Sequence, residues 1–239
     1  MIDIHNHGLF EVDDGASSKE EAVRMLQDAA EQGITAIVLT PHYRHGMFKY
    51  QTELVDAHFA ELKKEAEEIG IELFLGCEYH VNSRIIEYLQ QGRCHSMADG
   101  KYVLTEYSYE TEYAYIVEWT RILLRNGYIP IIAHAERYEC MLRKPERIEE
   151  IIRFGAFVQL NADSVIGKIG FRVKRFCKKI LKDNYKSLII ASDAHDMDER
   201  PSHMDQCYTY VSKKLGNDVA QAVFIQNPGE VARELSRLS

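Results

Sequence analysis

The sequence has few of the features that mark secreted, membrane or nucleic-acid-binding proteins. It contains five cysteines, an odd number, and no Cys-x-x-Cys pair, so neither a disulfide framework nor a zinc ribbon is expected. No apolar run approaches the ~20 residues that a membrane-spanning helix needs. Acidic residues outnumber basic ones by 37 to 29, whereas non-specific binders of nucleic acids or anionic membranes are usually basic. We therefore expect no nucleic-acid partner and no membrane insertion.

Two further absences narrow the expected location and chemistry. The chain opens with Met1-Ile2-Asp3-Ile4-His5, which lacks the basic and apolar segments of a secretory signal, so a cytoplasmic protein is expected. No cysteine has an arginine six positions later. The Cys-x5-Arg loop of cysteine-dependent tyrosine phosphatases is therefore missing, and with it their thiolate mechanism.

Short apolar segments alternate with amphipathic segments along the chain. Near-continuous apolar runs are typical of strands that are buried on both faces of a parallel sheet. The seven predicted strands are Ile2–His5, Ile37–His42, Leu73–Tyr79, Tyr102–Tyr107, Pro130–Ala135, Phe157–Ala162 and Leu188–Asp193. Between them, segments such as Val55–Ile69 repeat apolar residues at helical steps of three and four, with Gly70 as a helix stop.

Seven strand–helix units predict a barrel of parallel strands with one unit fewer than the usual eight. An open doubly wound sheet is the competing layout. No linker rich in proline, glycine and serine interrupts the pattern. Residues 1–239 are therefore expected to form a single α/β domain.

Six of the seven predicted strands end in side chains that bind metal ions. The proposed ligands are five imidazoles and four carboxylates: His5, His7, His42, His134, His195, Asp14, Glu78, Glu106 and Asp193. Each one alone is explained more simply as a hydrogen-bonded core histidine or as a helix-cap or ion-pair carboxylate. In a parallel barrel, however, all these strand ends open on one face. Clustering so many buried ionisable groups is unfavourable unless cations compensate them.

This donor set favours two or three divalent ions over one. Mixed nitrogen and oxygen ligands suit Mn²⁺, Fe or Zn²⁺ better than Ca²⁺. Three divalent ions would outweigh the four carboxylates in charge, so the centre would attract an anion despite the net charge of −8. Arg137 and Arg200 adjoin two of the strand ends, and a planar guanidinium is suited to bidentate phosphate capture.

The motifs also occur in a recognisable order. They are His5-x-His7 with Asp13-Asp14-Gly15, Thr40-Pro41-His42, Gly76-x-Glu78, Glu106, His134-x-Glu136-Arg137-Tyr138 and Ser192-Asp193-Ala194-His195. This series resembles the polymerase-and-histidinol-phosphatase (PHP) superfamily, and within it the manganese-dependent tyrosine phosphatases of bacterial capsule and exopolysaccharide operons (CpsB/YwqE type). Phe10 and Ala135 stand where that family often has proline.

The resemblance implies a distorted (β/α)7 TIM-like barrel with a trinuclear site, most simply of Mn²⁺. One ion would be held by His5, His7, Glu78 and Asp193. A second would be held by Glu78, Glu106 and His134. A third would be held by Asp14, His42 and His195.

The expected activity is hydrolysis of a phosphomonoester by metal-activated hydroxide. The resemblance implies a phosphotyrosine-containing protein of capsule or exopolysaccharide synthesis as substrate, and a cognate bacterial tyrosine kinase as a partner. Arg137 and Arg200 would neutralise the phosphoryl oxygens, and His42 or His195 would protonate the leaving oxygen. The alternatives are a histidinol-phosphate phosphatase, a PHP-type nuclease and a non-catalytic metal-dependent regulatory module.

Overall fold

The computed structural model describes residues 1–48 and 50–232. Its strands are β1 (Ile2–Asn6), β2 (Ala36–Leu39), β3 (His42–Tyr43), β4 (Glu72–Leu75), β5 (Glu78–His80), β6 (Tyr102–Glu106), β7 (Ile129–Ile132), β8 (Phe157–Asn161) and β9 (Leu188–Ala191). All seven predicted strand regions are confirmed, but the second and third are each divided into two short strands. Pro41, which has no N–H to donate, lies in the first break. Gly76 lies in the second, where a Cβ would approach Sδ of Met97 to 2.8 Å.

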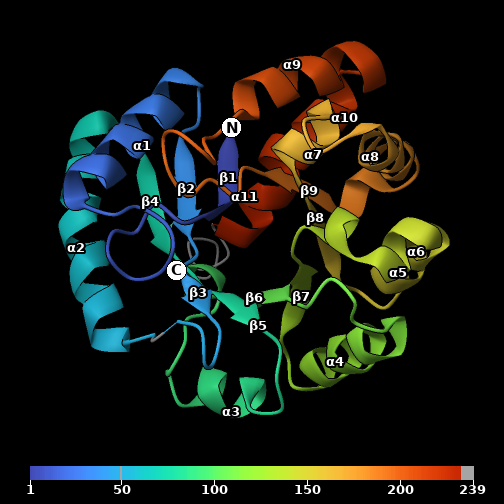
Figure 1. Cartoon of the computed structure of the whole chain (residues 1–239), viewed down its shortest axis with the longest axis horizontal. Coiled ribbons are helices and arrows are strands. Elements are labelled where there is room, and N and C mark those ends of the chain that lie inside the picture. Colours follow the sequence, from blue (N-terminus) through green and yellow to red (C-terminus); the bar gives the residue numbers. More distant parts are fainter. Residues whose placement is uncertain (49, 233–239) are drawn as a thin grey trace.

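The strands form a distorted parallel ring with helices outside it (Figure 1). One sheet has the order β1-β2-β4 and the other the order β3-β5-β6-β7-β8-β9. Within each sheet, neighbouring strands pair in parallel. At the other edge Asn6 and Ala194 form a parallel bridge. The His7 amide donates to the Ala194 carbonyl over 2.8 Å, and the Asp193 amide to the His5 carbonyl over 2.9 Å. The segment after β9 therefore lies beside β1, as in a distorted (β/α)7 barrel and not an open doubly wound sheet.

The helices follow the strands around the ring. They are α1 (Lys19–Glu31), α2 (Thr52–Ile69), α3 (Ile85–Gln90), α4 (Tyr113–Arg125), α5 (Glu139–Arg143), α6 (Glu146–Arg153), α7 (Ala162–Ile166), α8 (Phe171–Asn184), α9 (Met204–Leu215), α10 (Asn217–Gln221) and α11 (Asn227–Ala232). Helix α1 begins where the Ser18 side chain accepts a hydrogen bond from the Glu21 amide. Helix α2 ends at Gly70, whose φ of +90° favours glycine. Among the described residues, no helix combines the length and the apolar composition that a membrane span requires.

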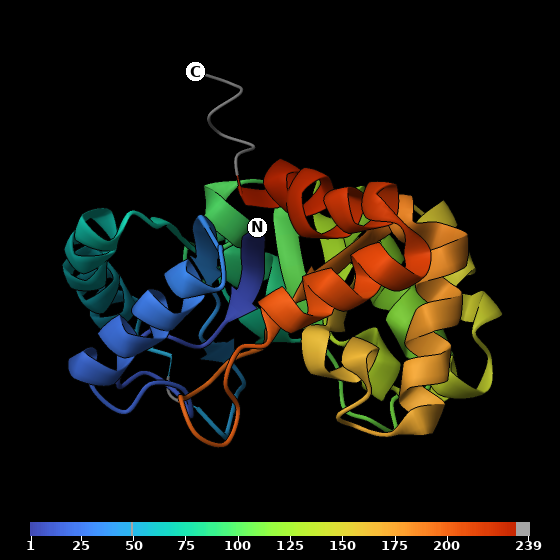
Figure 2. The same ribbon diagram turned by 90° about the horizontal axis from the view of Figure 1, so that it is seen from above.

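The interior of the ring is filled by apolar side chains from alternate strand positions. This inner cluster includes Ile2, Ile4, Val38, Leu104, Ile131 and Ile189, together with Val231 and Ala232 of α11. Residues of opposite parity, such as Ile37 and Ile190, join the larger cluster beneath the surrounding helices. In Figure 2, α11 lies beside the start of β1, and the loop after β9 projects at the opposite end. Polar side chains can therefore gather at the carboxyl ends of the strands, away from the inner apolar cluster.

Candidate metal centre

All nine predicted ligands lie at the carboxyl ends of the strands and converge on one site. Eight of them are buried, and Asp14 is exposed. Glu78 lies at the middle of this group. Its Oε2 atom lies 3.4 Å from Nε2 of His5 and 3.4 Å from Nε2 of His7. Its Oε1 atom lies 2.9 Å from Nε2 of His134. The convergence expected from the strand ends is therefore present in the structure.

The donor atoms gather into three overlapping groups, and within each group they all lie within 4.8 Å of one another. The groups are His5, His7 and Asp193; His7, Asp14, His42 and His195; and His42, Glu78 and Glu106. The first two contain most of the expected first and third ligand sets. The third contains the two expected carboxylates but has His42 in place of His134. His134 nevertheless remains close, with Nε2 4.0 Å from Oε1 of Glu106.

Several buried donor atoms have no hydrogen-bond partner among the described residues. These are Oε2 of Glu78, Oε2 of Glu106, Nδ1 of His42 and Nδ1 of His134. Oε2 of Glu78 and Nδ1 of His42 lie 2.9 Å apart, but without the angles of a hydrogen bond. Nε2 of His5 faces Nε2 of His7 at 3.2 Å. Leaving buried polar atoms unpaired is unfavourable. Divalent ions would supply the partner, so this donor set fits the predicted metals.

Electrostatics hold the central carboxylates in the ionised form that binds metals. Burial raises the pKa of Glu78, but the charges of His5 and His42 and a hydrogen bond from His134 outweigh burial, so the pKa lies well below its usual range. Burial likewise raises the pKa of Asp193, and His5 and Arg137 more than reverse the effect. Ionised carboxylates are the ligand form, so the centre is ready for cations.

Two of the proposed ligands have unusual backbone conformations. His134 follows β7 with a φ of +31°, and Asp193 follows β9 with a φ of +55°. Non-glycine residues in this left-handed region are strained, and such strain is concentrated at functional sites. Both residues lie just beyond the end of a strand, where the chain enters the site.

Strand β8, which carries no predicted ligand, supports the centre with two amide side chains that sequence reasoning missed. Gln159 accepts a hydrogen bond from the His134 amide over 2.6 Å, and its Oε1 lies 3.2 Å from Nδ1 of His5. Asn161 donates to Oδ2 of Asp193 over 2.7 Å and accepts from Gln159 over 2.8 Å. A carbonyl on Nδ1 of His5 leaves Nε2 free to bind metal. The sequence signal for this supporting role was the presence of two polar residues in the apolar run of β8.

Asp13 is a second supporting group that was not predicted as a site residue. Its Oδ2 lies 2.9 Å from Nδ1 of His7 and accepts from the His42 amide over 2.8 Å. Burial lowers the pKa of His7, but the charge of Asp13 and its hydrogen bond outweigh burial and raise that pKa well above 6.5. Asp13 therefore orients a proposed ligand through the ring nitrogen that faces away from the centre.

Replacing Asp13 by asparagine should weaken metal binding about 10- to 100-fold, because a carboxylate behind a ligating imidazole increases its basicity and fixes its orientation. Titration of the metal-free protein with Mn²⁺ by calorimetry measures this effect. Asp183→Asn, on the exposed part of α8, is the matched control and should bind metal as the unmodified protein does. Equal affinity in the two variants would contradict the role given to Asp13.

Both predicted arginines reach the centre. Nη2 of Arg137 lies 2.9 Å from Oδ2 of Asp193. Arg200 donates from Nη1 to Oδ2 of Asp14 over 3.1 Å and from Nη2 to Nε2 of His195 over 2.6 Å. Both line a cleft of about 590 Å³ above the ligands. This positive edge is suited to an anionic group.

The walls of this cleft contain further residues. Arg44, which was not predicted as a site residue, lines it, and its Nη1 lies 3.8 Å from Oε1 of Glu106. Phe48 also lines it, and its ring stacks on that of His42 with centroids 4.9 Å apart. The cleft therefore has cationic and aromatic walls around its floor of ligands.

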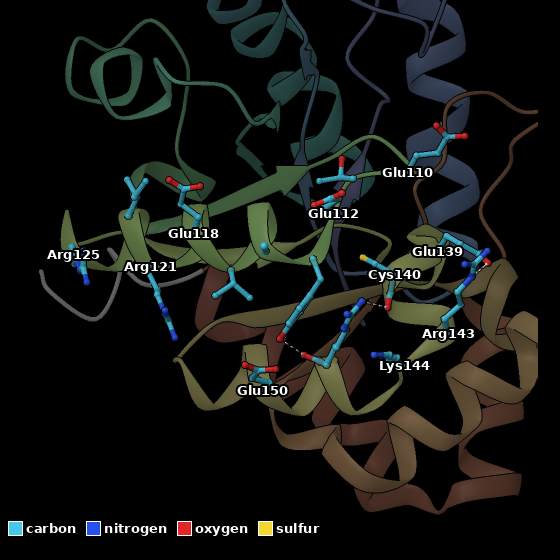
Figure 3. A pocket seen from close by; sticks show the side chains of 16 residues that line it. Glu110, Glu112, Glu118, Arg121, Arg125, Glu139, Cys140, Arg143, Lys144 and Glu150 are labelled. Atoms are coloured by element: carbon cyan, nitrogen blue, oxygen red, sulfur yellow. Dashed lines mark hydrogen bonds and ion pairs between the residues drawn. The ribbon is translucent and has the colours of Figure 1, made fainter.

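A larger groove of about 1270 Å³ lies outside the centre, between α4 and the α5–α6 segment (Figure 3). Its walls mix acidic and basic side chains, including Glu118, Arg121, Arg125 and Glu150. None of the candidate metal groups found among the described residues includes a residue of this groove. We therefore assign the chemistry to the smaller cleft.

Comparison with known proteins agrees with this geometry. The model of the family described as capsular polysaccharide synthesis, CpsB/CapC, matches residues 1–233. The tyrosine-protein phosphatase CpsB of Streptococcus pneumoniae is 34% identical over 237 residues, covering 97% of this chain and 98% of the relative. The tyrosine-protein phosphatase YwqE of Bacillus subtilis is 29% identical, with 98% and 97% covered.

Solved structures extend the comparison. A structure from the work on YwqE of Bacillus subtilis and CpsB of Streptococcus pneumoniae, described as unique metal-dependent tyrosine phosphatases, superimposes with a TM-score of 0.89 at 28% identity, covering 98% of this chain and 94% of the other. An organophosphorus hydrolase from Deinococcus radiodurans reaches 0.65 at 11% identity, covering 96% and 91%, which shows a shared fold alone. The chain therefore belongs to the CpsB/CapC family of capsular polysaccharide synthesis proteins.

Proposed function

We propose that this protein is a metal-dependent protein-tyrosine phosphatase that acts on a phosphotyrosine-containing protein of capsular or exopolysaccharide synthesis. The observation that carries the proposal is the convergence of nine imidazole and carboxylate side chains, of types that bind metals, beside two arginines at and beneath one cleft. The relatives named tyrosine-protein phosphatases support the choice of substrate. None of the described residues that line the cleft is a cysteine, which agrees with a mechanism without a thiolate.

The proposed cofactor is two to three divalent ions, with Mn²⁺ preferred over Fe or Zn²⁺. The proposed ligands are His5, His7, Asp14, His42, Glu78, Glu106, His134, Asp193 and His195. Residues 1–239 would act as one domain in the cytoplasm, with a cognate tyrosine kinase as the source of the phosphorylated substrate.

Bound divalent ions would supply hydroxide at neutral pH and would neutralise charge on the phosphoryl group. Arg137 binds one side of the substrate phosphate, because Asp193 holds its guanidinium at the cleft wall. Arg200 binds from the side of Asp14. These fixed cations stabilise the charge that develops on the non-bridging oxygens.

The leaving oxygen of a phosphotyrosine depends little on protonation. A tyrosinate has a parent pKa of about 10, so it departs more readily than an alkoxide. Burial and the charge of His7 lower the pKa of His195, which favours that residue as a ligand over a proton donor. His42, which has Phe48 stacked on its ring at the cleft wall, is the better placed of the two to protonate the leaving group.

Removing the metal should lower hydrolysis of p-nitrophenyl phosphate to background, and adding Mn²⁺ back should restore it, because the arginines alone supply no nucleophile. The assay measures initial rates after exhaustive chelation, with metal content determined on the same samples. A phosphotyrosine peptide and histidinol phosphate are then compared. Activity that survives complete metal loss would overturn the mechanism, and a strong preference for histidinol phosphate would overturn the substrate assignment. Failure of the metal-loaded protein to hydrolyse any monoester would favour the non-catalytic regulatory module.

A further inference from the structure

Large apolar side chains are exposed mainly at the mouth of the catalytic cleft. Among the described residues, five such side chains are exposed: Met47 (61%), Tyr109 (60%), Tyr115 (38%), Ile169 (56%) and Phe171 (79%). Three of them, Met47, Tyr109 and Ile169, line the cleft. Phe171 is exposed as well, but it is not among the residues that line the cleft. We call Met47, Tyr109 and Ile169 the apolar collar.

The collar is assembled from three separate parts of the chain. Met47 lies in the turn after β3, Tyr109 in the loop after β6, and Ile169 at the junction of α7 and α8. Each of the three has more than half of its accessible surface in water. Grouped apolar exposure around a polar site is typical of a surface that binds another molecule. The collar therefore has a role beyond the packing of this chain.

The cleft thus has two chemically distinct zones. The floor carries the ligands with Arg137 and Arg200, which suit a phosphoryl group. Phe48 lies on the wall with its ring stacked on His42, which suits the phenyl ring of a phosphotyrosine. At the rim the apolar collar stands beside the exposed pair Asp14 and Arg200. An apolar group that follows the phenyl ring would find contacts at the collar. A small polar phosphate ester would leave this rim in water.

We propose that the apolar collar binds bulky apolar or aromatic side chains that flank the phosphotyrosine in the polypeptide substrate. This inference rests on the proposed phosphatase function and specifies its substrate. The mixed-charge groove between α4 and α5–α6 is the competing surface for flanking residues, since Leu142 of α5 lines the cleft while Cys140 and Arg143 of the same helix line the groove. A segment bound in the groove would be selected by charge, whereas a segment bound at the collar is selected by apolar contact.

Two phosphotyrosine peptides distinguish these surfaces, one with leucine and phenylalanine beside the phosphotyrosine and one with serine and glycine there. The metal-loaded protein should hydrolyse the apolar peptide with a kcat/KM about tenfold higher, because a buried apolar side chain contributes roughly that factor in affinity. In the double variant Met47→Ser/Ile169→Ser, this ratio should fall close to one. Tyr115→Ser, which removes an exposed apolar side chain that does not line the cleft, should keep the ratio.

The outcomes separate the two proposals. A ratio near one in the unmodified protein, or an unchanged ratio in the double variant, would overturn the collar while hydrolysis of both peptides still supported the phosphatase. Arg125→Glu in the groove should leave the ratio unchanged, and a loss of preference in this variant alone would move the binding surface to the groove. If p-nitrophenyl phosphate is hydrolysed and neither peptide is, both the substrate assignment and the collar fail. Circular dichroism and metal content confirm that each variant is folded and loaded.

Discussion

Replacing Glu78 by glutamine is expected to abolish phosphatase activity, lowering kcat/KM by about 10³-fold or more. Glu78 is 1% exposed, and its two oxygens contact four imidazoles. It belongs to one candidate ligand group and contacts members of the other two, lying close to His5 and His7 on one side and to His42 and His134 on the other. Glutamine keeps the shape of the side chain but removes the negative charge with which Glu78 would hold the cations.

The same variant should also lose metal. The content of divalent ions per chain, measured by elemental analysis after loading with Mn²⁺ and desalting, is expected to fall by at least one equivalent. Glu68→Gln on the exposed face of α2 is the matched control, and it should keep both activity and metal. Full metal content with intact activity in the Glu78 variant would show that the site is organised around another residue.

Replacing Arg137 by alanine is expected to lower kcat/KM about 10²- to 10³-fold, the usual effect of removing a fixed donor to developing negative charge. Nη2 of Arg137 lies 2.9 Å from Oδ2 of Asp193, and the side chain lines the cleft. The charge of Asp193 raises the pKa of Arg137 against the effect of burial, so the guanidinium stays charged. Loss of this guanidinium should weaken stabilisation of the phosphoryl group more than it weakens metal binding.

The measurement therefore compares activity with metal content in the same preparation. We expect the Arg137 variant to keep most of its metal, because Asp193 also contacts His5 at 3.3 Å and accepts from Asn161 at 2.7 Å. Arg143→Ala, on α5 with its side chain 71% exposed and paired with Glu139, is the control. Equal loss of metal and activity would show that Arg137 supports the metal site instead of binding the substrate.

Local patterns in the chain were sufficient to predict the strands and the residues that end them. Apolar runs such as Phe157–Asn161 and Leu188–Ala191 form strands because a parallel barrel buries both of their faces. The ends of these strands meet on one rim in any such barrel, so His5, Glu78, His134 and their counterparts could be placed together without coordinates.

The contacts around the ligands could not be predicted in the same way. Gln159 and Asn161 are polar residues in an otherwise apolar strand, and their role depends on contacts with His5, His134 and Asp193, which come from other strands of the ring. Asp13 similarly acts through a contact to His7 that the loop after β1 creates. The position of Arg44 at the cleft depends on how the turn after β3 packs.

The sequence by itself determined the α/β class, the chain order of the strand regions and the donor types at their ends, because hydrophobic periodicity and residue chemistry are local properties of the chain. Closure into a barrel instead of an open sheet was decided by the tertiary structure. Only the tertiary structure decided which donors share a group, which side chains orient them, and that Met47, Tyr109 and Ile169 stand around one mouth. These features depend on distances between residues far apart in the chain. Ring closure between β1 and the segment after β9 sets those distances.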